Sequence, residues 1–131
     1  MKSDMLPALQ ELIDVVAHLR DPENGCPWDL EQTPERLTPY IIEEAYETVH
    51  AIRSNQSDQI VEELGDLLLQ VVLQAQIASE AGSFTLAEVA EGISKKLIRR
   101  HPHVFGDTQV SGVAEVRQNW EQIKAAEKGI D

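Results

Sequence analysis

Two short segments of the sequence concentrate carboxylate side chains at the spacing of one helical turn. The two sets, in EEAYE and EELGD, are Glu43, Glu44 and Glu47, and Glu62, Glu63 and Asp66. On a helix, Glu44 and Glu47 lie on one face, and the same spacing places Glu63 beside Asp66. Two such helices packed side by side would aim four carboxylates at one point. An all-oxygen ligand set without thiolates favours a hard divalent cation, Mg²⁺ or Mn²⁺.

A solvated surface is the simpler explanation for either cluster alone, because charged side chains seldom leave water. The second cluster argues against it. Glu62 and Asp66 lie on one side of a predicted helix, and that side continues into the segment LLLQVVLQAQIA. This segment is apolar on nearly every side, as expected of a buried helix. Several carboxylates in a low-dielectric pocket must take up protons or bind cations. Residues 38–94 contain only Arg53 and His50 as basic side chains. A bound metal ion is therefore the remaining way to neutralise the carboxylates.

One competing metal site is a di-iron centre. Glu47 and His50 have the E-x-x-H spacing that ferritin-like bundles use twice. Here that step occurs once, and the segment with the second acidic cluster offers no histidine. A carboxylate site for magnesium or manganese therefore remains the preferred interpretation.

Basic residues are concentrated in one short segment of an otherwise acidic chain. Four of the eleven lysines and arginines lie in KKLIRRHPH, namely Lys95, Lys96, Arg99 and Arg100. Magnesium bound by carboxylates usually keeps positions for water and substrate phosphates, and Lys96 and Arg100, one turn apart, are suited to clamp one polyphosphate. Lys124, four residues after Trp120, adds another cation. The alternative role of the cluster is to stabilise a helix C-terminus through the dipole.

The segment NGCPWDLEQT holds the only cysteine, Cys26, together with Trp28, Asp29 and Gln32. A catalytic cysteine loop, a substrate-binding loop and a plain connection between helices are all compatible with it. A thiol nucleophile needs an activating base or cation nearby, and a magnesium mechanism has no use for one. Cys26 is therefore expected to be a small packing residue. Asp29 followed by Gln32 predicts a capping box at a helix start.

The elements that position these residues are predicted to be helices throughout. Apolar residues recur at three- and four-residue steps, and no alternating strand pattern of useful length appears. Turn residues and caps separate five helices, at about 6–19, 39–53, 57–81, 86–100 and 113–127. Ser57 or Asp58 is expected to cap the third helix, and Gly82 to end it. The predicted fold is an all-α bundle of about five helices, forming a single domain over residues 1–131.

Composition restricts the class of protein. The chain has 131 residues and a formal net charge of −12, which argues against a nucleic-acid binder because phosphate backbones attract basic surfaces. One cysteine excludes an intramolecular disulfide and suits a reducing compartment. Neither a signal peptide nor a membrane-spanning stretch is recognisable. We therefore expect a cytoplasmic protein with no membrane or nucleic-acid partner.

Five motifs, read in order, resemble one protein family. GCPWDLEQT, EEAYE, EELGDLLLQVV, KLIRRHPHVFGD and NWEQIK cover about residues 19–124 and are similar to the MazG family of nucleoside triphosphate pyrophosphohydrolases. The resemblance implies an all-α, magnesium-dependent enzyme that hydrolyses NTP or dNTP to the monophosphate and pyrophosphate, with water attacking the α-phosphorus. It also implies a homodimer or homotetramer of interlocked helical bundles, in which the apolar third helix would form a shared core.

The resemblance also assigns roles to individual residues. The family's magnesium ligands match the two carboxylate pairs, Glu44 with Glu47 and Glu63 with Asp66. Its accessory catalytic acids, which hold a water or orient a ligand, match Glu43 and Glu62. Its phosphate-binding positions match Lys96, Arg100 and Lys124. A tryptophan of the nucleobase pocket in related dCTP-cleaving enzymes matches Trp28, and further nucleotide-binding candidates are Gln32 and Trp120.

Two departures from the family pattern support an alternative. Some members carry a lysine one turn before the first acidic pair, where this chain has Pro39 and Tyr40, and a lysine often precedes the second motif, where this chain has Gln59. Phosphate binding would then be weaker, or a partner subunit would supply the phosphate-binding residues. The alternative function is therefore a weakly active or inactive module for nucleotide binding or oligomerisation. Because many members hold two such domains in tandem, the chain is either a stand-alone form or a fragment.

Overall fold

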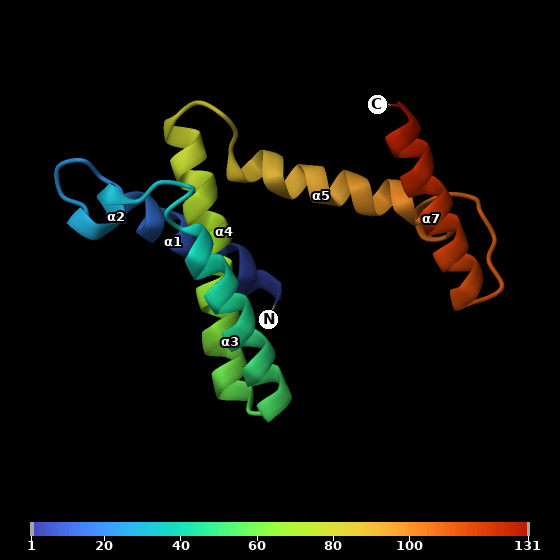
Figure 1. Cartoon of the computed structure of the whole chain (residues 1–131), viewed down its shortest axis with the longest axis horizontal. Coiled ribbons are helices and arrows are strands. Elements are labelled where there is room, and N and C mark those ends of the chain that lie inside the picture. The colour runs from blue at the N-terminus through green and yellow to red at the C-terminus, as the bar shows by residue number, and fades with distance from the viewer. Residues whose placement is uncertain (1, 131) are drawn as a thin grey trace. The chain divides into compact units, whose positions relative to one another are not determined.

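Residues 2–130, which the computed structural model describes, form seven helices and no strand. Five helices are long and two are short: α1 (Lys2–Leu19), α2 (Pro27–Glu31), α3 (Thr38–Ser54), α4 (Ser57–Glu80), α5 (Leu86–Arg100), α6 (Pro102–Phe105) and α7 (Val113–Ile130) (Figure 1). The predicted all-α class is confirmed. The chain divides into two compact units, residues 1–86 and residues 87–131, and each has its own side-chain contacts.

The five long helices lie where apolar periodicity predicts them, with small differences at their ends. Gly82 adopts φ +73° just after α4, a left-handed conformation that glycine tolerates without steric cost, so its predicted role as helix terminator is confirmed. The predicted cap of α4 is wrong, because Gln56 rather than Ser57 or Asp58 occupies the N-cap and makes no side-chain bond. α1 begins four residues earlier than expected and includes Pro7.

The loop predicted to hold a capping box contains the short helix α2 instead. α2 begins at Pro27 with Cys26 at its N-cap, so Asp29 lies within the first turn. The capping box between Asp29 and Gln32 is therefore a wrong prediction. Proline at the first helical position supplies a pre-set φ and lacks the N–H that would need a cap, which explains why the helix starts there.

The core of the first unit forms where α1 and the turn before α3 pack on the C-terminal half of α4. Its buried members are Val16, Leu37, Val72, Leu73 and Ile77. Burying a side chain of this size contributes roughly 1.5–3 kcal/mol. α3 packs along α4 as the other arm of a hairpin (Figure 1). This packing fixes the N-terminal half of α4, which carries the second acidic segment, beside the middle of α3.

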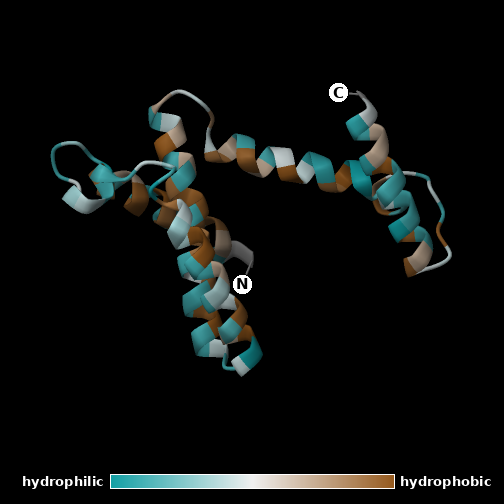
Figure 2. Cartoon of the chain, viewed as in Figure 1, coloured by the Kyte–Doolittle hydropathy of each residue, from teal (hydrophilic) through white to brown (hydrophobic). Residues whose placement is uncertain are grey.

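Large apolar side chains remain exposed on both arms of this hairpin, where Figure 2 shows apolar residues along α3 and α4. Ile42 and Tyr46 on α3, and Val61 and Leu64 on α4, are between 47 % and 73 % exposed. The segment from Leu67 onward, which was expected to be buried, does hold the buried residues of α4, although Leu68 and Val71 within it are 41 % and 45 % exposed. An apolar face stays open because α1 and α3 cover α4 on one side only.

The second unit consists of most of α5 together with α6 and α7. Arg99 and Arg100, at the end of α5, bond to Glu127 of α7, and no described residue of α5 is buried. This unit is therefore held together by polar contacts more than by an apolar core. Within residues 2–130, no helix has both the length and the hydropathy needed to cross a membrane.

Candidate functional site

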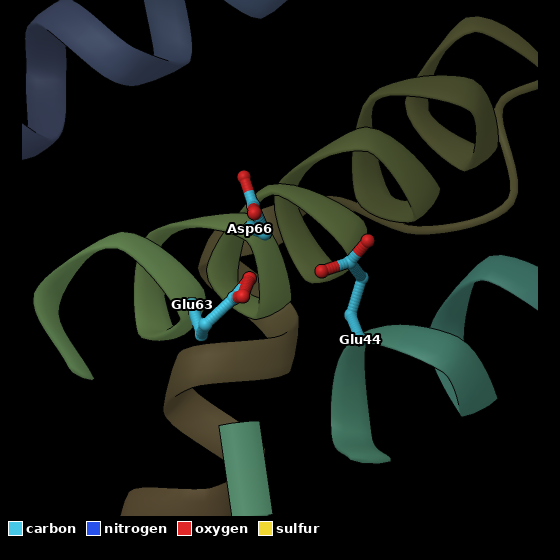
Figure 3. A group of neighbouring side chains, drawn as sticks. All are labelled: Glu44, Glu63 and Asp66. Atoms are coloured by element: carbon cyan, nitrogen blue, oxygen red, sulfur yellow. The ribbon is translucent and has the colours of Figure 1, made fainter. Parts of the chain in front are cut away.

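Three carboxylates meet on the facing sides of α3 and α4. Glu44 extends from α3, and Glu63 and Asp66 extend from α4, one helical turn apart (Figure 3). One oxygen atom of each residue lies within 4.8 Å of the corresponding atoms of the other two. All three side chains are partly buried. The two acidic segments thus come together in space at these three residues, as their spacing predicts.

A buried threonine joins the two helices at this point. The Thr48 hydroxyl lies 2.7 Å from the carbonyl oxygen of Glu44, one turn earlier in α3, and 3.2 Å from that of Glu63 in α4. Its single proton is shared between these two acceptors, and the residue is only 6 % exposed. Thr48 therefore sets the register of the backbone positions that carry two of the three carboxylates. Sequence reasoning missed it, because a lone threonine in a helix carries no signal of burial.

The three carboxylates are partly withdrawn from water and repel one another. Burial raises the pKa of Glu44 above the ordinary glutamate value, and the negative charge of Asp66 raises it further. Burial likewise raises the pKa of Glu63, with a hydrogen bond to Asp66 and the charge of Asp66 as the next causes. In both residues the ionised form is disfavoured by its surroundings. Such groups either take up a proton or bind a cation.

The donor atoms fit a hard divalent cation. Glu44 Oε2 is buried and meets no hydrogen-bond donor in the part of the chain that the structure describes. A buried acceptor left in this way costs about 1–3 kcal/mol, and a bound cation would remove that cost. Carboxylate oxygens without thiolate or imidazole are the ligands that Mg²⁺ and Mn²⁺ prefer. Glu44, Glu63 and Asp66 are therefore a candidate centre for a divalent metal ion.

Two further acids of the first segment lie close to this centre. Glu47 contributes no oxygen to the group of three, but its charge raises the pKa of both Glu44 and Glu63. The charge of Glu43 also raises the pKa of Glu44. Both Glu43 and Glu47 are exposed. Of the four predicted ligands, the structure thus brings three together and places Glu47 at their edge.

Glu62 is placed differently from its sequence interpretation. Glu62 and Asp66 were expected to lie on one partly covered side of the helix. Asp66 is partly buried, but Glu62 is exposed. The prediction of a partly covered Glu62 is wrong because α4 turns the neighbouring Glu63 toward Glu44. His50 is exposed and lies outside the carboxylate group, so the geometry does not favour the E-x-x-H alternative.

Trp28, the candidate nucleobase-binding residue, contacts the start of α3. The Trp28 and Tyr40 rings meet edge to face, with centroids 5.7 Å apart and an interplanar angle of 82°. Tyr40 precedes Glu44 by one turn of α3, so the loop lies beside the helix that supplies one carboxylate. The Gln32 side-chain amide donates to the Trp28 carbonyl oxygen at 3.0 Å. Cys26, at the N-cap of α2, is partly buried.

Arg20 helps to hold this loop in place. The Arg20 guanidinium binds both carboxylate oxygens of Glu80, at 2.6 and 3.2 Å, and also donates to the carbonyl oxygens of Asp29 and Gln32. Its side chain is only 9 % exposed, and the hydrogen bonds from Arg20 lower the pKa of Glu80. Arg20 therefore ties α2 to the ends of α1 and α4. Sequence reasoning missed this residue, because its partner Glu80 is 60 positions away.

In the second unit, cations gather around Trp120. The Arg100 guanidinium carbon lies 5.5 Å from the centroid of the Trp120 ring, and the Lys124 nitrogen lies 4.5 Å from it. Two predicted phosphate-binding residues thus share contact with the predicted nucleotide-binding tryptophan. Lys96, the third, is exposed. Glu127, which sequence reasoning missed, bonds to Arg100 from two turns beyond Trp120 on the same face of α7.

Known proteins resemble this chain in sequence. Residues 32–105 match the model of the MazG nucleotide pyrophosphohydrolase domain. The nucleoside triphosphate pyrophosphohydrolase/pyrophosphatase MazG of Thermotoga maritima is 52 % identical over 120 residues, which are 92 % of this chain and 45 % of that protein. The nucleoside triphosphate pyrophosphohydrolase of Escherichia coli K12 is 49 % identical over 120 residues, 92 % of this chain and 46 % of that protein. The chain thus spans about half the length of these relatives.

A solved structure shares the fold. The crystal structure of a mazG-related protein from Thermotoga maritima matches with a TM-score of 0.72 and 25 % sequence identity, over 88 % of this chain and 98 % of that one. The family model covers more than half of the chain, including both acidic segments and the last turn of α5. On this sequence match, which the shared fold supports, the chain belongs to the family of MazG nucleotide pyrophosphohydrolase domains.

Proposed function

We propose that the chain is a nucleoside triphosphate pyrophosphohydrolase that uses Mg²⁺, with Mn²⁺ as an alternative ion. Water adds to the α-phosphorus of an NTP or dNTP, and the bond from that phosphorus to the bridging oxygen breaks. The products are the nucleoside monophosphate and pyrophosphate. The observation that carries this proposal is the group of Glu44, Glu63 and Asp66, in which one oxygen of Glu44 is buried without a partner. Membership of the family supports the same reaction class.

The carboxylates of both helices have complementary proposed roles. Glu44, Glu63 and Asp66 hold the ion, with Glu47 as the fourth ligand. When bound, Mg²⁺ neutralises phosphate oxygens, activates water and stabilises the departing pyrophosphate. The accessory acids, Glu43 and Glu62, are exposed and are proposed to orient the attacking water and accept its proton.

The remaining site residues are proposed to bind the nucleotide. Lys96, Arg100 and Lys124 bind phosphate oxygens, and Trp120 lies against Arg100 and Lys124. Trp28 is 47 % exposed yet held by Tyr40, so it presents a fixed aromatic surface on which a base can stack. The proposed role of Gln32 is to keep Trp28 in position through the bond to its carbonyl oxygen and to contact a base edge.

We also propose that the chain forms a homodimer or homotetramer in the cytoplasm. Ile41, Ile42, Ala45, Tyr46 and Val49 line one apolar surface along α3, and Tyr46 is 73 % exposed. Monomeric proteins rarely leave such surfaces open to water. The cytoplasm is the compartment in which a nucleoside triphosphate would be the substrate.

Pyrophosphate release from a panel of NTPs and dNTPs, with and without Mg²⁺, tests the reaction and identifies the base preference. Glu63→Gln and Asp66→Asn should abolish release while the helical content by circular dichroism stays the same. Asp58→Asn is the matched control, because Asp58 is an exposed acid on the same helix. It should leave the rate unchanged. An unchanged rate in both site variants would refute the assignment of the centre.

A nucleotide-binding or oligomerisation module without turnover is the second candidate. Pro39 and Tyr40 favour it, since they stand where some family members carry lysine, and so does the bond that Glu127 makes to Arg100. Binding of a magnesium nucleotide without pyrophosphate release would support this alternative. Release that Glu63→Gln abolishes would reject it.

A further inference from the structure

One carboxylate in the second unit bridges two arginines. Glu127 of α7 accepts a hydrogen bond from Arg99 Nε at 2.6 Å and another from Arg100 Nη2 at 2.9 Å, through its two oxygens. The bond from Arg99, followed by that from Arg100, lowers the pKa of Glu127 to about 2. Glu127 is therefore an anion at any physiological pH, bound to both arginines at once.

Cations in this cluster outnumber the carboxylate. Arg100 and Lys124 both lie over the Trp120 ring, and Arg99 is joined to Arg100 through Glu127. Three positive charges thus accompany one negative charge, in a chain whose formal net charge is −12. Such a local surplus attracts an anion that carries two or more negative charges.

Glu127 satisfies Arg100 only in part. Arg100 Nε is buried and has no hydrogen-bond acceptor among residues 2–130, although a guanidinium can present two N–H groups side by side to one anion. The Arg100 side chain is 16 % exposed and lies over Trp120. Both this packing and the bond to Glu127 therefore hold it in place. Glu127 thus occupies one donor of an arginine that is already positioned, and leaves a second donor without a partner.

We infer that Glu127 is an internal anion that competes with phosphate for Arg99 and Arg100 and so sets the affinity of the basic cluster. The ligand class, a nucleotide phosphate or pyrophosphate, rests on the proposed function. A phosphate group has enough oxygens to serve Arg100 Nε and Nη2 together, whereas Glu127 in its observed position serves only Nη2. An incoming anion must displace Glu127, which favours highly charged ligands and weakens retention of the pyrophosphate product.

Calorimetric titration of inorganic pyrophosphate into the full chain tests this competition. EDTA in the buffer keeps metal away from the carboxylate centre, so that binding reports on the basic cluster. Glu127→Gln keeps the shape of the side chain and removes its charge, and it should tighten pyrophosphate binding about three- to tenfold, since partly exposed ion pairs contribute modest free energies. Arg100→Gln should abolish the binding, which places the ligand on the cluster.

Glu121→Gln is the matched control, because Glu121 is an exposed acid on the same helix. It removes the same charge and should change the affinity less than about twofold, as expected for a screened surface charge. Glu127→Asp keeps the charge but shortens its reach to the arginines, so it should give an affinity between those of wild type and Glu127→Gln. Circular dichroism checks that each variant is folded.

Equal or weaker pyrophosphate binding by Glu127→Gln than by Glu121→Gln would overturn the inference, because Glu127 would then only position the arginines. Absence of binding by every form would overturn it as well. The inference and the proposed reaction fail separately. Tighter binding by Glu127→Gln without any NTP hydrolysis by wild type would refute the reaction alone, and hydrolysis without the affinity change would refute the competition alone.

Discussion

Replacement of Thr48 by valine tests how far the candidate metal centre depends on the register of α3 and α4. The Thr48 hydroxyl lies 2.7 Å from the Glu44 carbonyl oxygen and 3.2 Å from the Glu63 carbonyl oxygen. Valine has nearly the same shape but cannot donate a hydrogen bond. Both carbonyl oxygens lie within helices and keep their backbone partners. The cost is therefore one lost hydrogen bond rather than two orphaned acceptors.

We expect Thr48→Val to lower the free energy of unfolding by about 1 kcal/mol, the usual contribution of one such bond, as measured by urea denaturation in EDTA. The Mg²⁺ concentration for half-maximal pyrophosphate release should rise by about tenfold, as is typical when a residue that supports metal ligands is lost. Thr48→Ser restores the hydroxyl and should recover most of both losses.

Ser54→Ala provides the matched control for this experiment. The Ser54 hydroxyl makes the same kind of bond, to the His50 carbonyl oxygen one turn earlier in α3 at 2.9 Å, but it is exposed. It has no hydrogen bond to α4 among the described residues. Its replacement should leave the Mg²⁺ dependence unchanged. If Thr48→Val behaved like Ser54→Ala in both measurements, the hydroxyl would not set the register of the two helices.

Three other perturbations follow from contacts elsewhere in the chain. Trp28→Ala should raise KM several-fold across nucleotides or shift base preference, while Tyr40→Phe, which keeps the ring contact, should not; a stability loss with unchanged KM would contradict this. Arg20→Lys should lower the free energy of unfolding by about 2 kcal/mol in urea, because lysine cannot replace a buried guanidinium that bonds Glu80 and two carbonyl oxygens, and a loss below that of Glu80→Gln would argue against it. The lowered pKa of Glu127 adds stability that is complete above the ordinary value of 4.5 and is lost as the pH falls towards about 2. The stability difference between wild type and Glu127→Gln, measured by denaturation at pH 7 and pH 3, should therefore shrink at the lower pH.

The helices and the convergence of acids are predictable from sequence because both rest on local periodicity. Carboxylates at three-residue spacing define one face of a helix, and a two-residue connection makes α3 and α4 neighbours. Which of two adjacent acids faces the partner helix is harder to predict. Glu62 and Glu63 differ by about 100° around the helix axis, and only the packing of α4 on α3 and α1 decides that Glu63 is covered.

The residues that support the site depend on partners far away in the sequence. Thr48 meets a carbonyl 15 positions later, Arg99 and Arg100 meet Glu127 after 28 and 27, and Arg20 meets Glu80 after 60. No spacing rule within one helix connects such pairs. Their side chains look like ordinary surface residues in the sequence, and the burial of Thr48, Arg20 and Arg100 becomes visible only when the helices are packed.

The hairpin of α3 and α4 has a consequence for how the chain reaches its native state. Glu44 and Glu63, on its two arms, are 19 positions apart, and contacts over so short a loop have a low entropic cost and form early in folding. Repulsion among the carboxylates opposes this closure until protons or a cation neutralise them. A divalent cation would therefore act as a reversible cross-link on a folding nucleus.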